Sequence, residues 1–270
     1  MKILFLGGGN MANALIGGML KRGFAASDIH VIDPGAEARG KLAETYAVNC
    51  HAGAASVPGG FAVIVLAVKP QQMKEALAQL AGKVDSAVVV SIAAGIDLAA
   101  MARWLGGYRK IVRAMPNTPA LIAAGITGLC ALPEVSTDER RLAEEVLQAV
   151  GSTVWIADEA QMDAVTAISG SGPAYVFLFI EALEQAAADL GLTPGEGRQL
   201  AIETVQGAAA LAAQSGEPAA LLRQRVTSKG GTTEAALRVM AEMGVKEGLI
   251  AGVKAAESRG RALGKALGAD

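Results

Sequence analysis

A short apolar run, Ile3 to Leu6, leads directly into the glycine-rich string Gly7-Gly-Gly-Asn-Met-Ala12. A buried strand followed at once by glycines and a helix is typical of the first half of a strand-helix-strand unit that binds dinucleotides. In the pattern G-x-G-x-x-A, Gly7 makes the tight turn and Gly9 lets the backbone approach a pyrophosphate. The helix N-terminus then offers free amide donors to the phosphates.

A carboxylate, Asp33, follows the second predicted strand at about the distance where an acid binds an adenosine ribose hydroxyl. A carboxylate there favours NAD because it repels a 2'-phosphate, but Arg39 is close enough in sequence to offset that charge. The choice between NAD(H) and NADP(H) therefore stays open, and a structural turn with a solvated Asp33 is the alternative. The residues predicted to bind the dinucleotide here are Gly7, Gly8, Gly9, Asn10, Met11 and Asp33.

Short β-branched runs alternate with helical patterns through the first half of the chain. Because these runs lack polar alternation, they indicate strands buried on both faces, as in a parallel sheet covered by helices. The main strands are predicted at Ile3–Leu6, Ile29–Ile32, Phe61–Val68, Ala87–Ile92 and Lys110–Ala114, with shorter ones at Ile126–Ala131 and Thr153–Ile156.

After about Asp158 the strand patterns cease, and Ala, Leu, Glu and Gln recur at helical spacing. The sequence therefore predicts an α/β protein with a Rossmann-like, mainly parallel sheet domain over 1–157, followed by an all-α substrate-binding and dimerisation domain over 158–270. In the helical half, the stretch Tyr175 to Ile180 after Pro173 is apolar on most sides. A partner subunit would bury such a helix, although the central helix of a monomeric bundle is the alternative.

The composition favours small-molecule chemistry. The net charge of -2, spread along 270 residues, provides no basic patch for nucleic acid or anionic lipid. Cys50 and Cys130 are not spaced as metal ligands, so we predict no metal site. The uncharged stretch Ala114–Pro133 is rich in proline, and Ala164–Ile180 is interrupted by Ser169-Gly-Ser-Gly-Pro173, so neither is expected to span a membrane. Without a signal-peptide pattern, we expect a cytoplasmic protein.

Acid-base residues are scarce in the helical half. His30 and His51 both lie in the nucleotide half, and no lysine occurs from Ile111 to Ser228. A dehydrogenase acting on an alcohol or ketone needs an acid or base at the oxygen, whereas the nitrogen of a C=N substrate can arrive already protonated. The scarcity therefore favours imine reduction.

Three segments combine glycines with small and polar residues: Arg113 to Pro119, Ser169 to Pro173 and Val226 to Thr233. The first follows the last main strand, where ligands gather beyond the carboxyl ends of a parallel sheet. The other two lead into helices, and their exposed amides and hydroxyls can form a concavity for a carboxylate. Each is an ordinary loop and cap by itself, but together they favour a substrate site.

In order and spacing, six motifs resemble the pyrroline-5-carboxylate reductase family, which makes proline by reducing a cyclic imino acid with NAD(P)H. The resemblance covers nearly the whole chain and is far more specific than one glycine loop. The motifs are Gly7 to Ala12, Ala67-Val-Lys-Pro70, Ala93-Ala-Gly95, Met115-Pro-Asn-Thr-Pro119, Ser169 to Tyr175 and Ser228 to Thr233.

The resemblance implies roles for particular residues. Thr233 would be the catalytic residue, hydrogen-bonded to the ring nitrogen. The cofactor would be NADP(H), with NAD(H) left open. Seven residues would lie against its nicotinamide side: Ala67, Val68, Lys69, Pro70, Ala93, Ala94 and Gly95. Residues holding the substrate carboxylate would be Ser228, Gly230, Gly231 and Thr232, and those shaping the pocket Asn117, Ser171, Gly172 and Pro173.

The resemblance also implies an obligate homodimer, often assembled into a larger ring. Two residues depart from the family pattern: Lys229 replaces the usual proline, and Asp33 replaces small or basic residues. Two other functions stay open. A hydroxyacid dehydrogenase would want a catalytic lysine on the central helix, yet none occurs between Pro173 and Gly191. A dinucleotide-responsive binding protein without turnover would accommodate the two departures.

Overall fold

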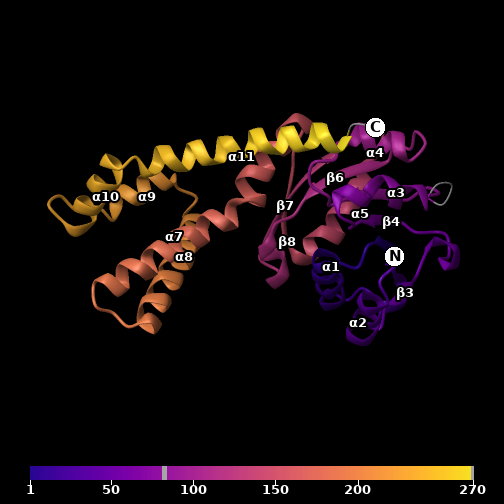
Figure 1. The fold of residues 1–270 in the computed structure, drawn as a ribbon, viewed down its shortest axis with the longest axis horizontal. Helices are drawn as coiled ribbons and strands as arrows, with labels where there is room; N and C mark the ends of the chain where they lie inside the picture. Colours follow the sequence, from indigo (N-terminus) through magenta and orange to yellow (C-terminus); the bar gives the residue numbers. More distant parts are fainter. Residues whose placement is uncertain (81–83, 269–270) are drawn as a thin grey trace. The chain divides into compact units, whose positions relative to one another are not determined.

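The computed structural model describes residues 1–80 and 84–268 (Figure 1). The chain forms two compact units. The first, called here the sheet unit, comprises Met1–Ser171 and Ala256–Asp270, and the second, the helical unit, comprises Gly172–Ala255. The carboxyl-terminal residues therefore group with the amino-terminal sheet rather than with the helices before them.

The sheet unit contains an eight-stranded sheet in the order β3-β2-β1-β4-β5-β6-β7-β8. All neighbouring strands are parallel except β6 and β7. The strands are β1 Ile3–Leu6, β2 Ile29–Ile32, β3 Asn49–His51, β4 Val63–Leu66, β5 Val88–Ser91, β6 Ile111–Met115, β7 Gly125–Ala131 and β8 Gly151–Trp155. The order from β3 to β6 is that of dinucleotide-binding folds, in which the ligand lies beyond the carboxyl ends of the strands, and it confirms the predicted fold class.

The main strands bury both of their faces. Along β1, Ile3 and Phe5 belong to one apolar cluster and Leu4 and Leu6 to the other, and each is at most 3% exposed. The first cluster includes residues of α1 (Asn10–Lys21) and α5 (Thr137–Leu147), and the second includes residues of α3 (Met73–Ala78) and α4 (Leu98–Trp104). Helices thus cover both faces of the sheet, as the apolar runs predict.

One strand was missed by the sequence analysis. β3 has only three residues, Asn49–His51, all half-buried, and it pairs with β2 at the sheet edge. Its residues carry no apolar run, because an edge strand needs less burial than a central one. Its neighbour α2, Ala36–Tyr46, connects the two strands.

The helical unit holds α7 Gly172–Asp189, α8 Pro194–Ser215, α9 Ala219–Arg225, α10 Thr232–Glu242 and most of α11 Val245–Gly268. α7 and α8 lie side by side (Figure 1). Among the described residues of this unit, only Gly197 and Ala201 are buried. In α7, Phe177 and Leu178 are 64% and 66% exposed, so a single chain does not cover the helix predicted to be buried.

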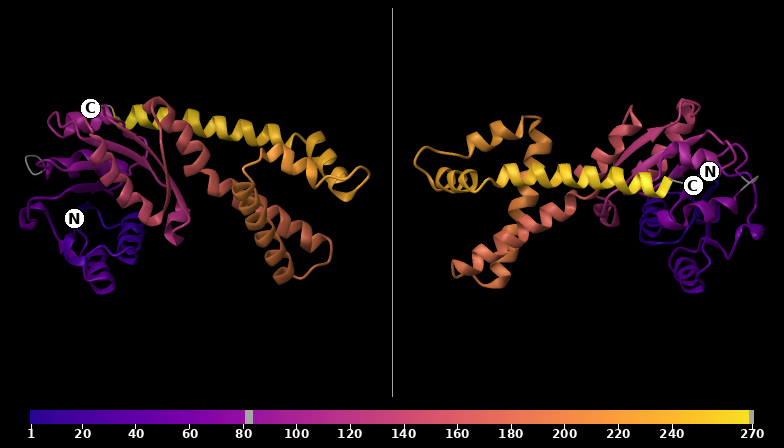
Figure 2. Two further views of the ribbon diagram at one scale, coloured as in Figure 1. Left: turned by 180° about the vertical axis from the view of Figure 1, so that it is seen from behind. Right: turned by 45° about the horizontal axis from the view of Figure 1, so that its top comes forward.

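The predicted boundary after residue 157 marks the change from strands to helices, since β8 ends at Trp155. The compact units instead divide after Ser171. Met162 on α6 (Met162–Val165) is 1% exposed within the sheet unit's core. The carboxyl end of α11 lies beside α4, where Arg103 Nη2 donates to the carbonyl oxygen of Gly268 at 3.0 Å (Figure 2). The change in secondary structure and the change in packing therefore fall at different residues.

The string Ser169–Pro173 does not break the helix as expected. Thr166–Gly170 forms a π turn, Ser171 N donates to Thr166 O at 2.8 Å, and Ser171 keeps helical backbone angles of -85° and -21°. The wider i to i+5 turn absorbs the glycines and serines without ending the helix. As a result, one described helical stretch, Glu159–Asp189, is long and apolar enough to cross a membrane by length and composition alone.

Candidate active site

The glycine-rich loop joins β1 to α1. Gly7 has a φ of +101°, and a Cβ there would lie 2.7 Å from the carbonyl oxygen of Ala67, so only glycine fits this turn. Gly9 precedes α1 without a side-chain cap, and nothing lies within 4 Å of a Cβ built on it. The loop therefore leaves open space and uncapped helix amides at its tip, which fits the pyrophosphate of a dinucleotide.

Asp33 is fixed beside this loop. Its Oδ2 accepts from Gly8 N at 2.8 Å, and its Oδ1 accepts from Gly35 N at 2.8 Å. Arg39 Nη1 donates to the main-chain oxygens of Asp33 at 2.7 Å and Pro34 at 2.8 Å. These contacts do not fit a freely solvated Asp33. They place a carboxylate and a guanidinium together where the adenosine ribose is expected.

Two further predicted segments lie at the same edge of the sheet. Ala67 N donates to Leu6 O at 2.8 Å, and Val68 Cγ1 lies 3.0 Å from a Cβ built on Gly7. Past β5, Ala93 N donates to Ser91 Oγ at 3.3 Å, and Gly95 has a φ of +80°. The structure thus gathers Gly7–Met11, Asp33, Ala67–Pro70 and Ala93–Gly95 at the carboxyl ends of adjacent strands.

Asn117 follows β6 and is 9% exposed. Its Nδ2 donates to Ser169 O at 3.1 Å, and its Oδ1 accepts from Ile126 N at 3.0 Å. A Cβ on Gly170 would lie 2.5 Å from Met115 Cε. The segment after β6 and the π turn are therefore in direct contact, and the Asn117 amide holds them together.

The Ser228–Thr233 segment lies in the helical unit, before and within the first turn of α10. Gly230 has a φ of +73°, and a Cβ on Gly231 would lie 2.5 Å from Ser228 Oγ. Gly231 precedes α10 without a side-chain cap, which leaves amides at this helix end. One amide is already used, because Gly230 N donates to Glu234 Oε2 at 2.7 Å. Sequence reasoning missed this contact of Glu234, because the N-cap residue is Gly231 and the Ser or Thr that would mark a capping box is absent there.

Comparisons with known proteins agree with this arrangement. The chain is 44% identical over 268 residues to the pyrroline-5-carboxylate reductase of Pseudomonas aeruginosa, covering 99% of this chain and 98% of that protein. The chain belongs to the pyrroline-5-carboxylate reductase family. It is also 37% identical to the Escherichia coli K12 member over 251 residues, with 92% and 93% of the two chains covered.

Family models and solved structures extend the match. A pyrroline-5-carboxylate reductase dimerisation model matches residues 159–263, and a model of coenzyme F420-dependent NADP oxidoreductases matches residues 2–95. The Coxiella burnetii pyrroline-5-carboxylate reductase structure has a TM-score of 0.91 at 39% identity, covering 97% of this chain and 98% of that one. The Plasmodium falciparum enzyme with NADP bound has a TM-score of 0.87 at 28% identity, with 98% of each chain covered.

Family membership accounts for the exposed apolar surface of the helical unit. The dimerisation model spans the whole of α7, including Phe177 and Leu178. Length and composition do not distinguish a membrane span from a helix buried between subunits. The family match favours a helix buried between subunits, because the helical half of this reductase matches a dimerisation region.

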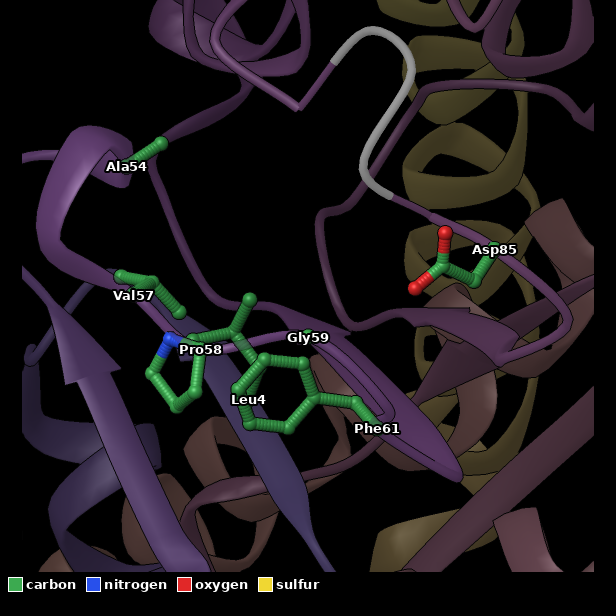
Figure 3. A pocket seen from close by; sticks show the side chains of 7 residues that line it. All are labelled: Leu4, Ala54, Val57, Pro58, Gly59, Phe61 and Asp85. Atoms are coloured by element: carbon green, nitrogen blue, oxygen red, sulfur yellow. The ribbon is translucent and has the colours of Figure 1, made fainter.

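Other features of the sheet unit lie away from this edge. One cavity of about 190 Å³ sits near the amino ends of β1, β4 and β5, with Asp85 across from Val57 and Pro58 (Figure 3). Burial raises the pKa of both Cys50 and Cys130, so neither is a ready thiolate. Within residues 1–80 and 84–268, no group of three His, Cys, Asp or Glu could hold a metal ion.

Proposed function

We propose that the chain reduces 1-pyrroline-5-carboxylate to L-proline by hydride transfer, the last step of proline biosynthesis. The observation that carries this proposal is the full-length 44% identity to a pyrroline-5-carboxylate reductase. NADP(H) is the cofactor, supported by the NADP oxidoreductase match over the glycine-rich loop. NAD(H) stays a second candidate because the Asp33 carboxylate is fixed beside that loop.

The residues of the sheet unit bind and orient the cofactor. In this proposal, Gly7 and Gly8 form the turn that faces the cofactor, the amides of Gly9, Asn10 and Met11 hold the pyrophosphate, and Asp33 accepts from the adenosine ribose. The segments Ala67–Pro70 and Ala93–Gly95 bound the nicotinamide side. When bound, the reduced nicotinamide supplies a hydride. Uncapped amides before α1 support this assignment.

The residues of the helical unit hold the substrate. The amides and hydroxyls of Ser228, Gly230, Gly231 and Thr232 fix its carboxylate, and Thr233 hydrogen-bonds the ring nitrogen. Asn117, Ser171, Gly172 and Pro173 shape the pocket. The hydride forms a C–H bond at the imine carbon while the C=N π electrons move to a nitrogen that arrives protonated. Positioning, rather than a strong proton donor, supplies most of the rate.

The chain acts on a small molecule as a homodimer, in agreement with the dimerisation match. We further propose that dimers associate into a larger ring and that the protein is cytoplasmic. A partner subunit, rather than a bilayer, would then cover Phe177 and Leu178. The near-neutral charge supports neither nucleic acid nor anionic lipid as a partner.

The test is a steady-state assay of pyrroline-5-carboxylate with NADPH and NADH in parallel. Thr233→Ala should lower turnover by about 10- to 100-fold, the value of one hydrogen bond to a charged group. The Kd for NADPH should hardly change, because Thr233 lies outside the sheet unit. Thr153→Ala is the control, since Thr153 Oγ1 donates to Glu144 Oε1 at 2.6 Å and lies outside every segment assigned to the site. Unaltered turnover in Thr233→Ala would remove that residue from the mechanism.

The assay also separates the two rival functions. A hydroxyacid dehydrogenase would oxidise NADPH with a keto acid instead of the imino acid. A binding protein without turnover would bind the nucleotide yet leave it unoxidised after the imino acid is added. Either result would contradict the proposed activity.

A further inference from the structure

Arg113 is a charged side chain within β6 that the proposed mechanism does not use. It is 8% exposed, and it lies opposite Cys130 on β7. A cation in such a place is costly unless it is paired and hydrogen-bonded. Arg113 Nη1 donates to Glu159 Oε1 at 3.0 Å, and Nη2 lies 3.8 Å from Asp163 Oδ1. Two carboxylates from one later segment therefore stabilise this cation.

The same oxygen of Glu159 has a second partner. It accepts from Leu98 N at 2.8 Å. Leu98 is the first residue of α4, and Asp97 Oδ1 already caps that helix by accepting from Ala100 N at 2.6 Å. The amide of Leu98 is one of the first-turn donors that a helix cannot satisfy internally, and Glu159 supplies the acceptor from outside. One carboxylate oxygen thus links β6 to the first residue of α4, which follows the turn Ala93–Gly95 by three residues.

A third segment is joined through Asp163. This residue lies on α6, which continues directly into the π turn Thr166–Gly170. Within this π turn, the carbonyl oxygen of Ser169 accepts a hydrogen bond from Asn117 Nδ2 at 3.1 Å. Asn117 follows β6, so this segment is tied to β6 twice. Arg113 within the strand contacts Glu159 and Asp163, and Asn117 just after the strand contacts Ser169.

We propose that Arg113, Glu159 and Asp163 form a positioning network that holds the cofactor turn Ala93–Gly95 in fixed register with the substrate-side segments around Asn117 and Ser169. The inference rests on the proposed function, which assigns those segments to the site. The network acts through its neighbours. Because hydride transfer depends on the alignment of the reacting atoms, a displacement of about 1 Å costs on the order of 100-fold in rate.

A positioning network and a purely structural ion pair predict different effects when they are broken. A structural pair, when broken, lowers the melting temperature but leaves the kinetics of the folded protein unchanged. A positioning network changes kcat, KM or nucleotide affinity at temperatures where every variant is folded. The two roles are therefore separable by kinetics measured well below Tm.

The decisive variant is Glu159→Gln, which keeps an oxygen for Leu98 N but removes the charge that faces Arg113. Arg113→Lys keeps the positive charge and should therefore retain more activity than Glu159→Gln. Glu134→Gln is the matched control, because it breaks the Arg109 Nε–Glu134 Oε1 pair of 2.7 Å, whose side chains are 49% and 43% exposed. The readouts are kcat and KM for pyrroline-5-carboxylate, Kd for NADPH without imino acid, and Tm.

We expect Glu159→Gln to lower kcat/KM about tenfold or more and to weaken NADPH binding by a smaller factor. Arg113→Lys should lie between this variant and the wild type, and Glu134→Gln should stay within about twofold of the wild type, as expected for an exposed pair. A lowered Tm with unchanged kcat, KM and Kd in both network variants would overturn the inference. If Glu159→Gln fails to fold, Arg113→Lys decides by the same criteria.

The failure of this inference differs from the failure of the proposed function. A wild-type protein that does not reduce pyrroline-5-carboxylate contradicts the function. In that case the Kd for NADPH still tests whether the network positions the cofactor turn, and an unchanged Kd in both network variants would overturn the network as well.

Discussion

The two units of the chain satisfy their apolar residues differently. In the sheet unit, residues such as Phe5 and Val65 are 0% exposed between two layers of helices. In the described helical unit, only Gly197 and Ala201 are buried, while Phe177 and Leu178 remain 64% and 66% exposed. Burial of apolar surface is the dominant favourable term in folding. The sheet unit therefore buries its core within one chain, whereas the helical unit leaves apolar surface exposed within the region that matches a dimerisation model.

The largest expected effect comes from placing a charge on that exposed surface. Phe177→Asp should convert the dimer to monomers at micromolar concentration and reduce activity by about 100-fold or more. If the partner subunit covers Phe177, loss of its side chain costs about 1.5–3 kcal/mol, and a carboxylate enclosed there without a partner adds further cost. Light scattering after gel filtration measures the mass, and NADPH oxidation measures the activity. Arg141→Asp on α5, where the side chain is 76% exposed, is the control that should stay dimeric and active. A dimeric Phe177→Asp would contradict the contrast between the units.

The reverse experiment damages the sheet unit alone. Gly7→Val should weaken NADPH binding by about 100-fold, because the new Cβ would meet the Ala67 carbonyl oxygen at 2.7 Å and the φ of +101° disfavours a β-branched residue. The dimer should persist. Gly23→Val is a matched control, because Gly23 has a φ of +90° with open space around a Cβ. Fluorescence titration gives the Kd, and gel filtration gives the assembly. Equal loss of NADPH affinity in both variants would attribute the effect to backbone strain rather than to the nucleotide loop.

The same contrast explains how much of the fold could be predicted from sequence. β1 and β2 have the predicted bounds because both are uninterrupted apolar runs buried on two faces. β3 was missed because a short edge strand lacks such a run. The predicted break of the helix at Ser169–Pro173 was wrong. The π turn that keeps the helix continuous depends on backbone contacts that residue types do not reveal.

The candidate site divides in a similar way. The loop at Gly7 could be predicted because its chemistry lies in backbone amides, and glycines mark where the backbone must be bare. The contacts of Glu159 could not be predicted, because Arg113 lies 46 residues away and Leu98 lies 61 residues away, with no periodicity that relates them. Pairings of that kind are set by the tertiary fold.

A smaller effect should appear in the acid stability of the sheet unit. Burial, then the nearby charges of His51 and Lys2, lower the pKa of His30, while Asp28 opposes them. His30 Nδ1 lies 3.0 Å from His51 Nε2, so a positive charge on His30 lies beside a second imidazole. The neutral form is favoured in the fold. The stability this provides is complete above the unfolded pKa of 6.5 and is lost as pH falls through the lowered folded pKa.

His30→Phe should therefore flatten the fall in the urea unfolding midpoint between about pH 7 and pH 5, since it removes the titrating group. The assembly measured by gel filtration over the same range should match that of the wild type, because the helical unit contains no histidine. An unchanged midpoint slope would assign the acid sensitivity to other groups.

The smallest effect should separate the two ligand loops themselves. In the glycine-rich loop no side chain caps the first amides of α1 after Gly9, whereas in the substrate loop Gly230 N already donates to Glu234 Oε2 at 2.7 Å. Glu234→Gln keeps an acceptor for that amide but removes a negative charge from the place proposed for the substrate carboxylate. An exposed charge of this kind is worth about 0.2–1 kcal/mol, so KM for the imino acid should fall by up to about fivefold with kcat unchanged. Glu242→Gln at the far end of α10 should leave KM unaltered. A rise in KM for Glu234→Gln would mean instead that the glutamate charge preorganises the loop, and the two loops would then differ in rigidity rather than in the availability of their amides.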